Sequence, residues 1–114
     1  MNGQLTVINL YGCDEIFLKS KKIISRFLLD LCRCIKMKPY KKPIVERFGK
    51  GNLRGYSALL WIETSSIVVH LDEREKKAFI DIFSCNRFNA SKAKDFSKKY
   101  LKAKKASFKT IIRK

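Results

Sequence analysis

Residues 55–85 read GYSALLWIETSSIVVHLDEREKKAFIDIFSC and contain three β-like runs in succession. The runs cover 56–63, 66–72 and 77–84, and each is short and rich in β-branched, aromatic or other large apolar residues, which favours strands. The charged stretch 73–76 has a length typical of a turn between the second and third runs. Consecutive strands with such short connections predict an antiparallel meander.

The chain before this meander contains a further strand and a helical pattern. Residues 5–12 alternate and are rich in β formers, so they predict a first strand. Residues 13–37 predict one long amphipathic helix with Asp14 as its N-cap. Its apolar residues at helical spacing are Ile16, Ile23, Phe27, Leu31 and Ile35. Residues 38–55 hold both prolines and three of the five glycines, which indicates a loop with at most one short edge strand, at 43–48.

The chain after the meander completes the fold prediction. Residues 89–103 predict a second helix, capped by Asn89 or Ser91, and residues 107–113 predict the last strand. The apolar face of this helix consists of Ala93, Phe96, Tyr100 and Ala103. We predict an α+β fold, a two-layer sandwich with a mostly antiparallel sheet and two helices on one face, in a single domain of residues 1–114.

The face of the sheet away from the helices must meet water or a partner. Four residues of the meander add apolar surface to strands that already supply core residues, namely Trp61, Ile67, Val69 and Phe79. Exposed apolar surface of this kind is typical of subunit contacts. We therefore predict that part of it forms a homodimer interface.

The composition is that of a folded and strongly basic protein. Of the 114 residues 46% are hydrophobic, and the net charge of +16 comes from 19 lysines and only 7 arginines set against 10 acidic residues. A high positive charge is typical of proteins that bind nucleic acid, but phosphate and base contacts favour arginine over lysine. The charge therefore leaves nucleic acid as an open alternative without selecting it.

Targeting, membrane and metal signals do not stand out in the sequence. No long apolar run follows a basic start, so we expect neither a secretion signal nor a membrane span, and we predict a cytoplasmic location. The four cysteines, Cys13, Cys32, Cys34 and Cys85, lack the spacing of metal ligands, so we expect no bound metal. They are interpreted as reduced thiols rather than disulfides.

Ser65 and His70, the single histidine, raise the possibility of chemistry within the meander. Five positions separate them, so a continuous strand would point them in opposite directions, and they can meet only if the chain turns at 64–66. A serine in a turn and a half-buried strand histidine explain the same residues without any activity. Likewise, Cys85 after an apolar strand fits a small core residue.

Three segments taken together nevertheless resemble a known family. They are LYGCD (10–14), GYSALLWIETSSIVVH (55–70) and FIDIFSC (79–85). In this order, followed by a lysine-rich helix and a last strand, they resemble the small prokaryotic S-adenosylmethionine decarboxylase proenzymes. The resemblance runs without a gap from residue 55 to residue 85 and includes the family's spacing of serine, histidine and cysteine.

The resemblance implies a self-cleaving enzyme. Ser65 would attack the carbonyl carbon of Thr64, the chain would break between residues 64 and 65, and Ser65 would become a pyruvoyl group that forms a Schiff base with the substrate's amine. His70 and Ser57 match the family residues that assist processing. Cys85 matches the residue that donates a proton after decarboxylation, a task that suits a thiol.

Some positions depart from the family pattern. Thr64 and Ser66 stand where the family has glutamate and histidine, and LDER at 71–74 replaces threonine-tryptophan-proline-glutamate. Gly51 and Leu53 replace a phenylalanine and a proline ahead of the glycine-x-serine segment. Processing residues are kept while substrate residues are lost. The pattern therefore leaves open a cationic substrate other than S-adenosylmethionine, with arginine and ornithine as the alternatives.

A protein of charge +16 would repel a cationic amino-acid substrate unless the pocket is locally acidic. Glu63, Asp72 and Glu73, together with Asp14, are the candidate acidic residues. The leading interpretation is a pyruvoyl-dependent decarboxylase of polyamine (spermidine) biosynthesis that acts as a homodimer of processed protomers. The two alternatives are an uncleaved, inactive relative and a basic nucleic-acid-binding module.

Overall fold

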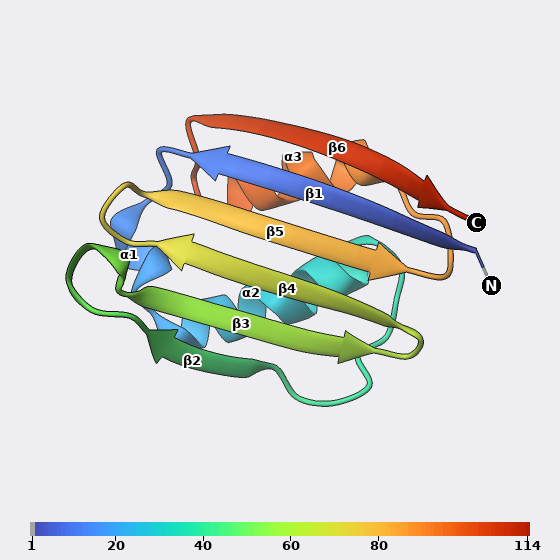
Figure 1. The fold of residues 1–114 in the computed structure, drawn as a ribbon, viewed down its shortest axis with the longest axis horizontal. Coiled ribbons are helices and arrows are strands. Elements are labelled where there is room, and N and C mark those ends of the chain that lie inside the picture. Colours follow the sequence, from blue (N-terminus) through green and yellow to red (C-terminus); the bar gives the residue numbers. More distant parts are fainter. Residues whose placement is uncertain (1) are drawn as a thin grey trace.

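The computed structural model describes residues 2–114 and contains one six-stranded sheet with all neighbouring strands antiparallel (Figure 1). The strands are β1 (Gly3–Tyr11), β2 (Ile44–Phe48), β3 (Gly55–Ile62), β4 (Ser65–Asp72), β5 (Lys77–Ser84) and β6 (Lys105–Arg113). The helices are α1 (Glu15–Leu18), α2 (Lys21–Cys34) and α3 (Ala90–Tyr100), with a short 3₁₀ turn, η1, at Gly51–Leu53. The strand order is β2-β3-β4-β5-β1-β6, and the predicted α+β sandwich is confirmed.

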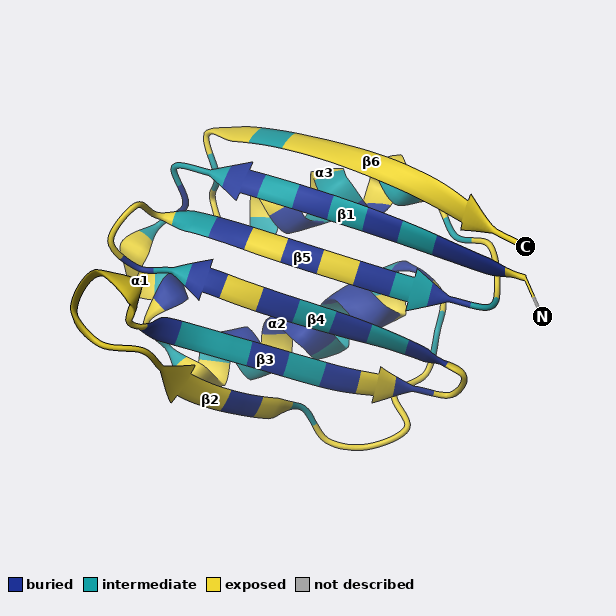
Figure 2. Ribbon diagram, in the orientation of Figure 1, coloured by how far each residue is buried: buried dark blue, intermediate teal, exposed yellow. Residues whose placement is uncertain are grey.

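The helices cover one face of the sheet and leave the other face open (Figures 1 and 2). Phe27, Leu28 and Leu31 of α2 are at most 1% exposed and pack with the inward residues of the strands. Each such side chain contributes about 1.5–3 kcal/mol through removal of its apolar surface from water. The predicted edge strand at 43–48 is present as β2, and the predicted meander is β3-β4-β5.

The prediction of one long first helix is wrong. The chain forms α1 and α2 instead, because the Ser20 hydroxyl accepts a hydrogen bond from the Ile23 amide and caps a new helix. Asp14 does cap the first helix, accepting from the Ile16 amide at 3.0 Å. Ile16 itself is 72% exposed rather than part of the core, since α1 is only one turn long.

The second helix agrees with its prediction. Asn89 caps α3 by accepting a hydrogen bond from the Lys92 amide. The ring of Tyr100 packs against Phe27 with 5.1 Å between centroids, and its hydroxyl donates to Asp30 at 2.9 Å. These contacts join α3 to α2 behind the sheet.

The open face of the sheet carries only part of the apolar surface expected there. Trp61 and Phe79 are 49% and 38% exposed, as predicted, but Ile67 and Val69 are fully buried beneath the helices. The alternation along β4 points its odd-numbered residues toward the helices and its even-numbered residues outward. Within residues 2–114, no helix is long and apolar enough to cross a membrane.

Candidate active site

The turn between β3 and β4 contains the predicted cleavage site. Ile62 pairs with Ser65 across the two strands, so Glu63 and Thr64 alone form the turn. Ser65 was expected in the connection but is the first residue of β4. The Thr64–Ser65 peptide therefore joins a tight turn to a strand that the sheet holds in place.

Thr64 adopts a left-handed backbone conformation, with φ of 60°. This region is unfavourable for residues with a Cβ, and for a β-branched residue it is a genuine outlier. The Thr64 hydroxyl donates a hydrogen bond to the Glu63 carbonyl oxygen at 2.6 Å, which helps to hold the turn. Backbone strain is thus located at the residue whose carbonyl carbon would be attacked.

Cys85, which directly follows β5, contacts the same peptide. Its thiol donates a hydrogen bond to the Thr64 carbonyl oxygen, with 3.1 Å between sulfur and oxygen. A donor at this position can stabilise negative charge that develops on the oxygen when a nucleophile adds to the carbonyl carbon. Elsewhere in the fold, burial raises the pKa of Cys13 to about 11 and also raises the pKa of Cys32.

The Ser65 side chain points toward the helices and is only 7% exposed. Its hydroxyl donates a hydrogen bond to the Ser84 hydroxyl at 3.1 Å. The sequence interpretation did not include Ser84. A signal was available, because the alternation of β5 places Ser84 on the buried face after Ile80 and Ile82, where a polar group needs a partner.

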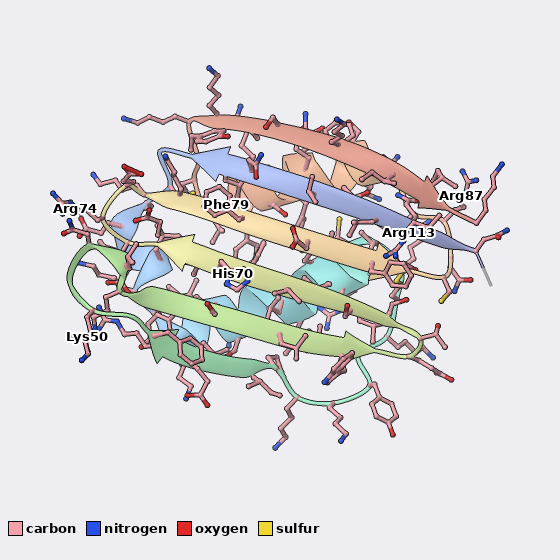
Figure 3. All side chains as sticks on the ribbon, in the orientation of Figure 1. Lys50, His70, Arg74, Phe79, Arg87 and Arg113 are labelled. Atoms are coloured by element: carbon pink, nitrogen blue, oxygen red, sulfur yellow. The ribbon has the colours of Figure 1, made fainter. Side chains whose placement is uncertain are left out.

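His70 and Ser57 lie directly opposite each other on β4 and β3, on the open face of the sheet. Ser57 Oγ and His70 Nδ1 are 2.9 Å apart, within hydrogen-bond distance. Figure 3 shows His70 beside Phe79 near the middle of this face. His70 is five residues along β4 from Ser65, about 16 Å at roughly 3.3 Å per residue, and points to the other side of the sheet. One chain therefore brings together Ser65, Thr64 and Cys85, and separately His70 and Ser57.

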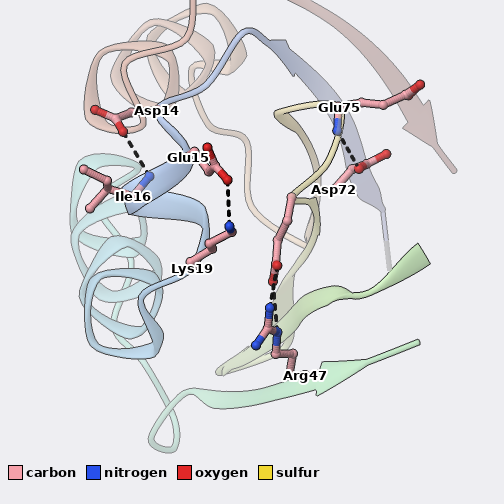
Figure 4. A network of polar contacts seen from close by, with 8 residues as sticks. Asp14, Glu15, Ile16, Lys19, Arg47, Asp72 and Glu75 are labelled. Carbon is pink, nitrogen blue, oxygen red and sulfur yellow. Dashed lines mark hydrogen bonds and ion pairs between the residues drawn. The ribbon is translucent and has the colours of Figure 1, made fainter. Parts of the chain in front are cut away.

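Of the acidic candidates, only Glu63 lies beside the cleavage site. Asp72 and Glu73 are at the opposite end of β4, where the Asp72 carboxylate accepts the Glu75 amide at 3.0 Å (Figure 4). Glu73 is nearly buried and receives two hydrogen bonds from the Arg47 guanidinium, at 2.6 and 3.1 Å.

The remaining acidic candidate, Asp14, also lies at that far end of the sheet. It caps α1 (Figure 4), and the next residue back, Cys13, donates its amide hydrogen to the carbonyl oxygen of Lys76 in the β4–β5 turn. Asp14 and Glu73 are thus each engaged in holding the fold.

A cavity of about 430 Å³ adjoins the turn on its helix side. Its lining combines the turn with the chain that follows α2, and consists of Lys36, Met37, Lys38, Ile62, Glu63, Thr64, Ser65 and Asn86. The cavity therefore presents one carboxylate and two ammonium groups beside Ser65. A small molecule with both charges would find complementary groups there.

Comparison with known proteins gives concordant matches over the chain. A model of the S-adenosylmethionine decarboxylase family matches residues 4–114. The S-adenosylmethionine decarboxylase proenzyme of Clostridium botulinum (strain Langeland) is 31% identical over 113 residues, 98% of this chain and 94% of that protein. That of Clostridium tetani is 28% identical over 103 residues, 90% of this chain and 79% of that protein.

A solved structure also resembles this one. The adenosylmethionine decarboxylase from Aquifex aeolicus VF5 matches with a TM-score of 0.79 at 17% identity, covering 96% of this chain and 88% of that one. At this identity the likeness supports the fold alone. The family match and the botulinum relative carry the assignment, because both span nearly the whole chain. The chain belongs to the S-adenosylmethionine decarboxylase family.

Proposed function

We propose that this protein is a pyruvoyl-dependent S-adenosylmethionine decarboxylase that processes itself between Thr64 and Ser65 and supplies decarboxylated substrate for spermidine synthesis. The observation that carries the proposal is the hydrogen bond from the Cys85 thiol to the carbonyl oxygen of Thr64. It joins the candidate proton donor to the candidate scissile peptide, next to a buried serine. Family membership favours S-adenosylmethionine over arginine or ornithine, and favours an enzyme over a nucleic-acid-binding module.

Self-processing needs no reactant besides water. The Ser65 oxygen bonds to the Thr64 carbonyl carbon, the C–N bond breaks, and the hydroxyl proton ends on the released amine, which gives an ester. Loss of the Ser65 Cα proton then expels Thr64 as a carboxylate. The elimination leaves a dehydroalanine enamine, which takes up a proton at its CH2 carbon to become an imine. Addition of water to this imine releases ammonia and leaves a pyruvoyl group at residue 65. The carbonyl hydrogen bond of Cys85 assists the first step.

The residues around Ser65 fit a pyruvoyl group. The side chain of Ser65, the precursor of the group, is buried. The Cys85 thiol contacts the other side of the same peptide, at the Thr64 carbonyl oxygen. When present, the group supplies an electron-withdrawing carbonyl for decarboxylation. Cys85 would protonate the product carbon, and Glu63 would attract the cationic part of the substrate into the adjoining cavity.

His70 can serve the cleavage site only from a second copy of the chain. Within one chain it lies on the opposite face from the Ser65 hydroxyl, about 16 Å along the strand at roughly 3.3 Å per residue. Phe79, opposite His70 on β5, and Trp61, four residues beyond Ser57 on β3, expose apolar surface on the same face, which favours packing of two open faces. We therefore propose a homodimer in which the His70–Ser57 pair of one protomer serves the turn of the other.

The orientation of Ser65 suggests which step His70 assists. The Ser65 hydroxyl faces the helices, so an imidazole that approaches from the open face meets the backbone first. That position suits removal of the Cα proton in the elimination step rather than activation of the hydroxyl. Asp72 shares the open face with His70 and would accompany it into the partner's site, whereas Glu73 is retained as a structural ion-pair partner of Arg47.

The proposed activity fits a cytoplasmic location, which stays a prediction. The four cysteines are free thiols, which fits a reducing compartment.

Intact mass and decarboxylase assays test the proposed function. The purified protein is expected to consist of residues 1–64 and a second chain from residue 65 that is lighter by one ammonia than an unmodified fragment. It should release CO₂ from S-adenosylmethionine, and Ser65→Ala should remain a single inactive chain. A wild-type chain that stays intact and inactive would refute the proposal.

Co-expression tests the homodimer. Ser65→Ala cannot be cut but carries His70, whereas His70→Ala carries the nucleophile. Each variant alone should remain uncut, and in mixed dimers the His70→Ala chain should be cut at Thr64–Ser65. If mixing restores no cleavage although mixed dimers form, His70 acts within its own chain or not at all.

A further inference from the structure

The contact between Ser65 and Ser84 is built by the register of the sheet. Ser66 pairs with Phe83 as the last pair of the β4–β5 ladder, and Ser65 and Ser84 occupy the next position beyond it on each strand. Ser84 is fully buried, and the two hydroxyl oxygens are 3.1 Å apart. The partner of the candidate nucleophile thus comes from a strand rather than from a loop, which favours a fixed geometry.

The hydrogen bonds of Ser84 decide which way the proton of Ser65 points. A serine hydroxyl has one hydrogen to donate and two lone pairs to accept with. Ser84 accepts the Asn86 amide at 2.9 Å and directs its own hydrogen toward the Met37 sulfur at 3.7 Å. One lone pair remains, and Ser65 fills it as the donor. Both lone pairs of the Ser65 oxygen are therefore left unused by Ser84.

Two consecutive residues contact the two reacting groups. Ser84 holds the nucleophilic hydroxyl of Ser65, and Cys85 holds the Thr64 carbonyl oxygen at 3.1 Å. Ser84 is the last residue of β5 and Cys85 is the first residue of the bend that follows, so two adjacent side chains reach the same peptide. The end of β5 thereby fixes the nucleophile relative to its target, which is what acyl transfer within one residue requires.

We propose that Ser84 is a positioning residue for the first step of self-cleavage, which keeps the Ser65 hydroxyl a donor and its lone pairs available to the Thr64 carbonyl carbon. The inference rests on the proposed function and deepens it. In that step the oxygen–carbon bond forms, the carbon–nitrogen bond breaks, and the Ser65 proton moves to the amine. Ser84 keeps its own proton throughout and acts only through Ser65.

Cleavage can be followed in time on chains made by cell-free translation. Ser84→Ala should be cut about 10- to 100-fold more slowly, because small misplacements of a reacting group have costs of this order. Ser84→Thr retains the hydroxyl and should stay within about threefold of wild type. Ser97→Ala is the matched control, because Ser97 is as fully buried as Ser84 but lies on α3. The Ser97→Ala chain should be cut at the wild-type rate.

Hydroxylamine, which cuts esters, distinguishes the first step from later ones. His70→Ala should accumulate ester and be cut rapidly by hydroxylamine, whereas folded Ser84→Ala should remain an amide and resist it. Rapid hydroxylamine cleavage of Ser84→Ala, or self-cleavage at the wild-type rate, overturns the role proposed for Ser84. A wild-type chain that never cleaves overturns the proposed function as well.

Folding is checked for every variant by circular dichroism. If Ser84→Ala does not fold, the Ser84→Cys variant provides the test instead. A cysteine side chain has nearly the volume of serine but offers the Ser65 hydroxyl only a weak acceptor. Slow cleavage of a folded Ser84→Cys chain, with hydroxylamine resistance, supports the inference. Wild-type kinetics in that variant contradict it.

Discussion

The left-handed backbone of Thr64 allows a test of whether strain at the scissile peptide speeds self-cleavage. A residue with a Cβ in the left-handed region, here at φ of 60°, costs roughly 1–2 kcal/mol. Asparagine tolerates this region better than a β-branched residue. Thr64→Asn should therefore relieve about 1 kcal/mol in the intact chain. If cleavage uses this strain, the variant should be cut about fivefold more slowly, since 1.36 kcal/mol corresponds to a factor of ten in rate.

Two measurements distinguish the presence of backbone strain from its contribution to the cleavage rate. In the uncleavable Ser65→Ala background, Thr64→Asn should raise the thermal midpoint by about 4 °C, from an unfolding entropy of roughly 2.1 cal/mol/K per residue over 114 residues. In the cleavable background, the rate of chain cutting is followed by gel. Thr64→Val retains the β-branched shape without the hydroxyl and should cleave as the wild type does.

The two readouts refute different parts of the reasoning. If Thr64→Asn does not stabilise the Ser65→Ala chain, the turn stores no strain. If it stabilises that chain but cleavage proceeds at the wild-type rate, the strain exists and the reaction does not use it. A slow Thr64→Val variant would instead assign the effect to the hydrogen bond between the Thr64 hydroxyl and the Glu63 carbonyl.

Further predictions concern packing, pH and substrate. Gly55→Ala should lower the free energy of unfolding by about 2–3 kcal/mol, because its Cβ would lie 2.1 Å from the Leu71 carbonyl oxygen; an unchanged denaturant midpoint would contradict this. Burial and the hydrogen bond to Asp30 raise the pKa of Tyr100 from 10.0 to about 12. Unfolded chains lose this proton first, so stability should fall as pH rises from about 10 to about 12, and Tyr100→Phe should remove that slope. Glu63→Gln should raise KM for S-adenosylmethionine with little change in kcat, and unchanged kinetics would exclude Glu63 from substrate binding.

The fold was predictable because its strongest signals are local. The alternation of the meander and the short turns between its strands specify antiparallel pairing without reference to the rest of the chain. The break between α1 and α2 was not predictable from periodicity, since apolar residues continue at helical spacing across it. The break depends on one contact, in which the Ser20 hydroxyl accepts the Ile23 amide and caps α2. The prediction that Ile67 and Val69 lie on the open face of the sheet was wrong, since both are buried beneath the helices. Apolar residues occur on both faces of β4, so the sequence does not show which face the helices cover.

The candidate site was predictable only in part. The proximity of Cys85 to Thr64 agrees with the expectation from the family resemblance. The separation of His70 from Ser65 follows from their odd spacing, but the proposal that a second chain supplies His70 requires knowledge of which face is covered. Ser84 was missed because a hydroxyl in an apolar strand becomes informative only when its partners are known.

The place of β1 in the sheet has a consequence for the processed protein. β1 belongs to the first fragment, yet it lies between β5 and β6 of the second fragment (Figure 1). After the proposed cut between Thr64 and Ser65 the two fragments would therefore be interleaved, and neither could leave without breaking a ladder on both sides of β1. Once unfolded, the fragments must find each other in solution. Refolding then becomes a bimolecular reaction whose yield depends on concentration, whereas the proenzyme folds as one chain.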